Sequence, residues 1–441
     1  MALREQDPVV YTILEAERRR QLEGVELIPS ENYVSAAVLA AMGSIFTNKY
    51  SEGYPGRRYY GGNEHVDEVE RLAQERAKAL FGTPHANVQP YSGSPANLAV
   101  YFATCRPGDV IMGQNLPDGG HLTHGWSVSI TGTYYRSVPY HVKPDGYIDM
   151  EEVHRLAREH RPRLIWCGAT AYPREFPFED FAAVADEVDA YFAADISHVA
   201  GLIVAGVHRS PTPHAHIITT TTHKTLRGPR GAMILVTERG LSRDPELAEK
   251  IDRAVFPGLQ GGPHDHTTAA IAVALGEAMR PEFKTYGAQV VQNARALAAS
   301  LAARGFTVVT GGTDNHMLLL DLTPTGPGRG LFLQEALDRV GITVNKNTIP
   351  GEPSTPFYPS GVRLGTPAAT TRGMREAEME QLGAWIAVVA ERIEAFQMPV
   401  ERKARARVLQ EFRETVRTDP GLARLREEVR RFCVRFPLPG I

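Results

Sequence analysis

The chain has 441 residues, of which 43% are hydrophobic and 22% are charged, and its formal net charge is −3. These values exclude a disordered or fibrous protein, and the weak net charge gives no basic field that would attract nucleic acid or an anionic membrane. No apolar run approaches the ~18 residues that span a bilayer, the N-terminal sequence lacks a signal-peptide pattern, and three scattered cysteines form no disulfide framework, so we expect a cytoplasmic protein.

The first eighty residues read as two helices joined by an arm. Residues 8–23 carry apolar side chains near helical spacing and predict an amphipathic helix. Residues 24–62 are rich in Gly, Pro, Ser and Tyr, which indicates an extended arm. Residues 65–81 are charged and helical, and Gly82 is a typical stop signal.

From residue 86 to residue 280, short apolar runs alternate with helical stretches. Strands are expected at residues 110–112, 164–167, 191–194, 217–218 and 233–236, with helices at 94–103, 150–160 and 178–188. Such alternation predicts a βαβ-type sheet covered by helices.

The last third of the chain changes in pattern near Pro281, which interrupts a helical run and marks an expected domain change. The expected elements after it are a helix at residues 286–304, strands at 307–309 and 317–321, a helix at 331–340 and a strand at 342–344. The last sixty residues are strongly helical and charged.

A lysine with unusual surroundings follows one predicted strand, in the string TTTTHKTLRGPRG at residues 219–231. Most lysines are solvated surface charges, and Lys224 read alone fits that description. Here it stands beside His223 and several hydroxyls, directly after a buried strand. A lysine in such a place can have a lowered pKa and form a Schiff base with a carbonyl compound.

A carboxylate ends the preceding strand, in the string YFAADISHVAGL at residues 191–202. Ligands bind at the carboxyl ends of such strands, and Asp195 there can pair with a pyridinium nitrogen. The alternative is an ordinary helix N-cap. The spacing from Asp195 to Lys224, across one further strand, favours a cofactor site.

Four other segments hold polar groups that suit a ligand. Gly93 and Ser94 precede a predicted helix and offer an anion site, although Ser-Gly-Ser also marks an ordinary helix cap. His121 lies in the glycine-flanked string GGHLTHG, whose spacing does not match a zinc helix, so no metal site is expected and the imidazole is available to stack on a ring. Arg363 alternates with apolar residues as on a strand and could clamp a carboxylate, or be a surface charge. Glu52 lies among tyrosines in the arm, which could pack on another subunit.

These segments together resemble the serine hydroxymethyltransferase family, from about residue 8 to the C-terminus. The strings that carry the resemblance occur in order: LIPSEN, NKYSEGYPGRRYYGG, GGHLTHG, TTTTHKTLRGPRG, FPGLQGGP, TDNH, GITVNKNTIP and SGVRLGTP. The resemblance implies the fold-type I (aspartate aminotransferase-like) α/β architecture of pyridoxal-phosphate transferases. It further implies a mostly parallel seven-stranded sheet, a smaller C-terminal α/β domain and a homodimer. The expected parts are an N-terminal arm and dimer contact at 1–62, a cofactor-binding domain at 63–280 and a small domain at 281–441.

The resemblance also implies a role for individual residues. Lys224 matches the lysine that binds pyridoxal 5'-phosphate, Asp195 the partner of its ring nitrogen, and His121 the imidazole stacked on the ring. The remaining cofactor contacts are expected from Gly93, Ser94, Thr170, His198 and His223, joined by Tyr50, Gly261 and Gly262 of the neighbouring subunit. Amino-acid substrate contacts are expected from Arg363, Ser30, Tyr60 and His198. Glu52, lent by the other subunit, matches the proton-transfer carboxylate near the serine hydroxyl, and the catalytic set is completed by His223 and Tyr60. Folate contacts are expected from Glu52, Leu116, Gly120 and Asn347.

The activity implied is reversible transfer of the serine hydroxymethyl carbon to tetrahydrofolate, which leaves glycine. The alternatives are an α-methylserine hydroxymethyltransferase, a β-hydroxyamino acid aldolase using the same residues, and a non-catalytic binding protein. The last is disfavoured because Lys224, Asp195 and Arg363 are all present. The sequence departs from the family pattern at Pro95, Thr170 and Ser197, where glutamine, serine and alanine are usual.

Overall fold

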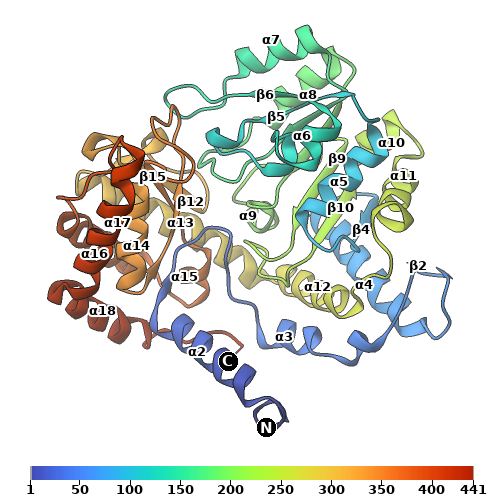
Figure 1. Cartoon of the computed structure of the whole chain (residues 1–441). Helices are drawn as coiled ribbons and strands as arrows, with labels where there is room; N and C mark the ends of the chain where they lie inside the picture. The colour runs from blue at the N-terminus through green and yellow to red at the C-terminus, as the bar shows by residue number, and fades with distance from the viewer. Residues whose placement is uncertain (1, 441) are drawn as a thin grey trace. The chain divides into compact units, whose positions relative to one another are not determined.

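The computed structural model describes residues 2–440, which form two compact units. We call residues 34–291 with residue 440 the sheet unit, and residues 2–33 with 292–439 the terminal unit. Both are coloured along the chain in Figure 1. The expected arm contributes residues to both units. The division into three parts remains a prediction, and its end residues 1 and 441 lie outside the described range.

A seven-stranded sheet is the framework of the sheet unit. Its strands, in spatial order, are β4 (His85–Asn87), β10 (Ala232–Val236), β9 (Ile217–Thr221), β8 (Tyr191–Asp195), β7 (Leu164–Cys167), β5 (Val110–Gln114) and β6 (Arg136–Tyr140). The run from β9 to β6 is parallel, whereas β10 is antiparallel to both of its neighbours. The predicted mostly parallel, seven-stranded α/β sheet is therefore confirmed.

Side chains of the central strands alternate between two apolar clusters. In β7, Leu164 and Trp166 belong to one cluster, whereas Ile165 and Cys167 belong to the other. Strands β8, β9 and β10 alternate in the same way. A sheet that is buried on both faces explains why these strands read as continuous apolar runs rather than as alternating ones.

Helices alternate with these strands along the chain, and most of them contribute buried residues to the two clusters. They include α3 (Ala36–Met42), α4 (Glu64–Phe81), α5 (Gly93–Thr104), α6 (Ile130–Tyr134), α7 (Met150–His160), α8 (Phe178–Glu187), α9 (Ala200–Val204), α10 (Glu238–Arg243), α11 (Leu247–Arg253) and α12 (Asp265–Ala278). Helix α4 ends at Gly82 in the left-handed conformation, with φ of 65°, as its sequence predicts.

The expected extended arm is partly wrong. It contains helix α3, which begins after Ser35, whose side chain accepts a hydrogen bond from the backbone N–H of Val38. A 3-10 turn at Ile45–Asn48 and a short hairpin of β2 (Gly53–Tyr54) and β3 (Arg57–Arg58) follow. The arm is therefore locally ordered rather than simply extended.

The terminal unit is a smaller α/β arrangement. Its four-stranded antiparallel sheet has the order β11 (Thr307–Val308), β12 (Met317–Asp321), β15 (Gly361–Gly365) and β14 (Asn345–Asn347). A separate parallel pair joins β1 (Val25–Glu26) to β13 (Ile342–Thr343). The helices are α1 (Ala2–Gln6), α2 (Pro8–Glu23), α14 (Gly330–Arg339), α15 (Pro367–Thr371), α16 (Glu376–Arg392), α17 (Arg402–Thr418) and α18 (Pro420–Cys433).

Helix α13 (Pro281–Ala303) contributes residues to both units. Because α12 ends at Ala278, Pro281 does separate two helices, but α13 begins at that proline, earlier than the expected residue 286. Proline is tolerated in the first turn of a helix, where its missing N–H has no helical partner to lose. Among residues 2–440, no helix combines the length and apolarity needed to cross a membrane.

Candidate active site

A small cavity lies where the parallel strands of the sheet unit end. Its lining comes from the segments that follow β5, β7, β8 and β9 and from the start of α5, and it encloses ≈ 300 Å³ between the lining atoms. The lining residues are Gly93, His121, His124, Ala169, Thr170, Asp195, Ser197, His198, Thr221 and Lys224. Six of the predicted site residues therefore meet at the sheet edge where ligands bind in such folds.

Asp195 is held in this cavity by three donors. Its Oδ2 accepts from Asn97 Nδ2 at 2.9 Å and faces His124 Nε2 at 3.1 Å, while Oδ1 accepts from the backbone N–H of Ser197 at 3.0 Å. Burial alone would raise the pKa of Asp195, but the hydrogen bond from His124 and the nearby Lys224 outweigh it and lower the pKa below the usual range. The cavity thus contains a carboxylate that stays ionised at neutral pH.

Lys224 is presented by a closed loop after β9. The backbone N–H of Thr222 donates to Gly231 O at 3.1 Å, and Thr222 Oγ1 donates to Pro229 O at 2.6 Å, which ties the loop's ends together. Thr225 Oγ1 donates to His198 O at 3.0 Å and accepts from the N–H of Gly201. The loop that carries the lysine is therefore fixed to the segment that follows Asp195.

Each of the two histidines of the loop after β5 has a ring nitrogen within hydrogen-bond distance of another side chain. Burial and the neighbouring His124 lower the pKa of His121 to about 4, so its ring is neutral at pH 7. His121 Nδ1 lies 2.7 Å from Thr123 Oγ1. One ligand atom each of His121, His124 and Asp195 lie within 4.8 Å of one another, a spacing that a metal ion could bridge. However, the Asp195 oxygens and His121 Nδ1 already have hydrogen-bond partners, and that favours an organic ligand.

Buried polar atoms at or near the cavity that have no partner among the described residues include Thr221 Oγ1 and His124 Nδ1, in the cavity wall, and His223 Nδ1. Burial, then Lys224, lowers the pKa of His223 to about 3, so this ring is also neutral. A Cβ placed on Gly93 would lie 2.8 Å from Thr221 Cγ2, so only glycine allows the start of α5 to approach β9 this closely. Because Ser92 makes no side-chain cap bond there, the helix start can bind an anion.

Two of the predicted folate residues, Leu116 and Gly120, lie on the turn after β5. The backbone N–H of Gly119 donates to Leu116 O at 3.0 Å, and that of Gly120 donates to Asn115 O at 3.0 Å. The N–H of Thr170 donates to Gly119 O at 2.7 Å, which links this turn to a residue of the cavity wall. Neither Leu116 nor Gly120 lines the cavity itself.

Five predicted residues gather in a second place, which we call the Glu52 cluster: Tyr50, Glu52, Tyr60, Gly261 and Gly262. Tyr50 Oη donates to Glu52 Oε1 at 3.2 Å, and the rings of Tyr50 and Tyr60 meet edge-on at 4.8 Å. A Cβ on Gly261 would lie 3.1 Å from Glu52 Oε1, and one on Gly262 would lie 3.3 Å from the Tyr50 ring. None of the five lines the cavity of Lys224.

The other predicted residues, Ser30, Asn347 and Arg363, belong to the terminal unit. Arg363 lies on β15 as predicted, is 5% exposed and donates from Nε to Asn345 Oδ1 at 3.0 Å; burial lowers its pKa to about 10. The segment that carries Ser30 is bonded to the same strand, because the N–H of Gly365 donates to Leu27 O at 2.7 Å. Asn347 lies on β14, which pairs with β15.

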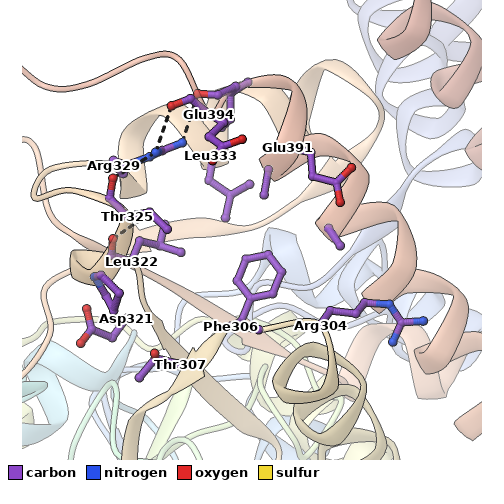
Figure 2. A pocket seen from close by; sticks show the side chains of 15 residues that line it. Arg304, Phe306, Thr307, Asp321, Leu322, Thr325, Arg329, Leu333, Glu391 and Glu394 are labelled. Carbon is purple, nitrogen blue, oxygen red and sulfur yellow. Dashed lines mark hydrogen bonds between the residues drawn. The ribbon is translucent and has the colours of Figure 1, made fainter.

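A larger crevice in the terminal unit, shown in Figure 2, contains none of the predicted site residues. It has a volume of ≈ 870 Å³, with Phe306, Leu322 and Leu333 among its apolar walls. Its two arginines are already engaged, since Arg329 donates to three backbone carbonyls and Arg304 to Ser300 and Glu380. The crevice therefore offers no open cation for a substrate carboxylate.

Sequence reasoning missed the residues that hold Asp195. Asn97 follows Ser94 by three positions on α5, so helical spacing was the signal that could have placed it on the same face. Ser197, one of the departures from the family pattern, accepts from the N–H of Thr221 through its Oγ at 3.0 Å. An alanine there could not make this bond between the ends of β8 and β9.

Comparison with known proteins gives one consistent result. A family model described as serine hydroxymethyltransferase matches residues 3–386. Relatives named serine hydroxymethyltransferase from Sorangium cellulosum and Acidothermus cellulolyticus are 55% and 56% identical over 441 residues, which is all of this chain and 97% of each relative. A third, from Phenylobacterium zucineum, is 56% identical over 406 residues, covering 91% of this chain and 93% of the relative.

Proposed function

The chain belongs to the serine hydroxymethyltransferase family, and we propose that Lys224 and Asp195 are the residues on which its reaction depends. The family's enzymes use pyridoxal phosphate and transfer the hydroxymethyl carbon of serine to tetrahydrofolate, leaving glycine. The observation that carries the proposal is a carboxylate, held by three donors, in the same small cavity as a lysine. When bound, the cofactor supplies an electron sink for the bond that breaks at the substrate's α-carbon.

The chemistry of the cavity fits that cofactor. Lys224 would bind its aldehyde carbon, and Asp195 would hold a proton on its ring nitrogen. The neutral ring of His121 suits a stacking contact, with Thr170 and His198 completing the walls. For the phosphate, the donors are the start of α5 at Gly93 and Ser94 together with His223, and the unpartnered Thr221 Oγ1 is one more polar atom there.

Substrate binding is assigned to the terminal unit. We assign Arg363 as the clamp on the amino-acid carboxylate, because a guanidinium held on a buried strand presents fixed paired donors. Ser30 contributes from the segment bonded to that strand. Fixing the substrate carboxylate in this way would select which bond of the α-carbon breaks, and such positioning is worth ~7–11 kcal/mol in favourable cases.

Proton transfer is assigned to Glu52, with Tyr60 and Tyr50 beside it. The carboxylate would take the proton of the serine hydroxyl as the carbon–carbon bond breaks and return it in the reverse direction. The folate co-substrate would lie against Glu52, Leu116, Gly120 and Asn347. Gly261 and Gly262 lie beside Glu52 and Tyr50, which is why we treat the five residues of the Glu52 cluster as one group.

The enzyme is proposed to be a cytoplasmic homodimer in which each Glu52 cluster completes the partner's cavity. This explains why the cluster lies outside the lining of its own cavity. Coexpression of Glu52→Gln with Lys224→Gln tests it: hybrids then contain one intact site, and a random mixture regains about one quarter of wild-type activity. Sites built within one chain would leave every hybrid inactive.

A further inference from the structure

A buried arginine binds the backbone on both sides of Glu52. The side chain of Arg58 is 4% exposed, and it bridges two acidic residues of α4, with Nε 2.8 Å from Asp67 Oδ1 and Nη2 2.6 Å from Glu70 Oε2. Its remaining nitrogen, Nη1, donates to the backbone carbonyls of Ser51 at 2.8 Å and Gly53 at 2.9 Å. These two carbonyls flank Glu52 on either side.

Further contacts fix the same stretch of backbone. Gln89 Nε2 donates to Gly53 O at 2.9 Å and to Glu70 Oε1 at 2.8 Å, so one amide joins the hairpin to the acidic partner of Arg58. The N–H of Tyr59 donates to Glu52 O at 2.9 Å. Gly53 has φ of 104°, a backbone conformation that favours glycine.

The energetic cost of burying this ion network indicates a role other than stabilising the fold. Burying one cation with two carboxylates carries a desolvation penalty that often cancels the Coulomb attraction, so a buried ion pair is weak evidence for stabilisation. The ion network fixes the orientation of the planar Arg58 guanidinium. Its donors then hold the backbone carbonyls of both neighbours of Glu52. The Glu52 side chain keeps its own contact, with Tyr50.

We propose that Arg58 is a positioning residue for the reaction, which holds the backbone at Ser51 and Gly53 so that the Glu52 carboxylate is presented at the correct place. The inference rests on the proton-transfer role proposed for Glu52. The chemistry requires this precision because misplacing a catalytic group by about 1 Å can cost ~10²-fold in rate. Lysine cannot replace Arg58, since its single ammonium cannot bridge Asp67 and Glu70 and also reach two carbonyls.

The test is a double-mutant cycle on the holoenzyme with Arg58→Lys, Glu52→Gln and the double variant. Arg58→Lys is expected to lower kcat for serine ~10–100-fold with little change in KM. In the Glu52→Gln background the same change is expected to lower kcat less than about 2-fold, because the group being positioned is no longer a carboxylate. Arg57→Lys is the matched control, as Arg57 is exposed on the same hairpin and has no side-chain partner among the described residues.

Amide hydrogen exchange gives a readout independent of turnover. Arg58→Lys should speed exchange in the peptide spanning residues 51–59, which contains the Tyr59 N–H, and leave the peptide of α5 unchanged. If Arg58→Lys fails to fold, Gln89→Met removes the second donor to Gly53 O while the ion pair of Arg58 with Glu70 remains, and it should act in the same direction, more weakly.

Three results would overturn the inference: unchanged kcat in Arg58→Lys, an equal loss in both backgrounds, or unchanged exchange at residues 51–59. If Glu52→Gln itself retains wild-type kcat, the proposed role of Glu52 fails, whereas the exchange measurement still reports whether Arg58 holds the hairpin. The two failures are therefore distinguishable.

Discussion

His124 Nε2 lies 3.1 Å from Asp195 Oδ2, so a histidine from the turn after β5 contacts the carboxylate at the end of β8. Because an ionised carboxylate only accepts, His124 must donate from Nε2, and its buried Nδ1 has no partner within residues 2–440. This bond is one of the causes that lower the pKa of Asp195 against the effect of burial. Asp195 therefore owes its charge to a residue whose role the sequence did not reveal.

Replacing His124 by leucine should raise the pKa of Asp195, since burial then opposes ionisation with less compensation. The acidic limb of the kcat/KM profile is expected to shift to higher pH, while activity near pH 8 falls much less. Asp195→Asn removes the charge at every pH and should lower kcat/KM throughout. Coincident acidic limbs for His124→Leu and the wild type would contradict the electrostatic link.

Glu26 makes the stability of the fold depend on pH. Burial, with the nearby Glu31 carboxylate, raises the pKa of Glu26 to about 9, although its Oε1 accepts from the N–H of Ile28 at 2.8 Å. In the unfolded chain this carboxyl has the ordinary glutamate pKa of 4.5. Between the two values the folded protein holds the extra proton, so stability is greatest below the unfolded pKa and falls as pH rises toward the folded one.

The variant Glu26→Gln should remove that dependence while keeping an oxygen to accept from Ile28. Its unfolding free energy should exceed that of the wild type near pH 8, with a difference that grows by at most ~1.4 kcal/mol per pH unit above the unfolded pKa. The two proteins should converge near pH 4.5. Denaturant unfolding at several pH values measures this, and parallel curves for the two proteins would refute the assignment.

Arg372 joins the two ends of the terminal unit. It is 3% exposed and donates to the carbonyls of Gln21, Leu22 and Gly24 at the end of α2, and to those of Cys433 and Phe436 after α18. The carbonyls of Gln21 and Leu22 lie in the last turn of α2, where a helix leaves such groups without helical partners. The guanidinium thus links the N-terminal helix to the C-terminal one.

The variant Arg372→Met should lose ~3–5 kcal/mol of stability, because several buried carbonyls lose their donor together. Arg424→Met is the control, since Arg424 is exposed on α18 and makes no described side-chain contact. The change should appear as a lower denaturation midpoint of the terminal unit. Equal midpoints for the two variants would show that the bonds of Arg372 contribute nothing net.

The features that were predicted best from the sequence are those that depend on a local pattern of residues. Asp195 was found because it ends an apolar run, and Lys224 because it follows the next predicted strand; the strand order then brings those strand ends to one sheet edge. The contacts of Asp195 with Asn97 and His124 join residues 98 and 71 positions apart. Such contacts depend on the order of the strands in space, which the periodicity of the sequence does not predict.

Three elements that were not predicted from the sequence each have a cause in their own local sequence or length. Helix α3 was hidden because its apolar run, Ala36–Met42, is flanked by the glycine- and tyrosine-rich segments that led us to expect an extended arm. Strand β6 (Arg136–Tyr140) was missed because it contains Pro139 and lies at the sheet's edge, where one side needs no ladder bond. Strand β4, which is antiparallel and lies at the other edge, was missed because it has only three residues.

The central claim is that Lys224 binds the cofactor, and chemical reduction tests it most directly. Holoenzyme treated with borohydride is converted to a stable secondary amine at the lysine that bears pyridoxal phosphate, and peptide mass spectrometry then locates the added mass. We predict modification of the peptide that contains Lys224, and none there in Lys224→Gln. Modification of a different lysine, or a cofactor-saturated protein whose Lys224 peptide remains unmodified, would contradict the account.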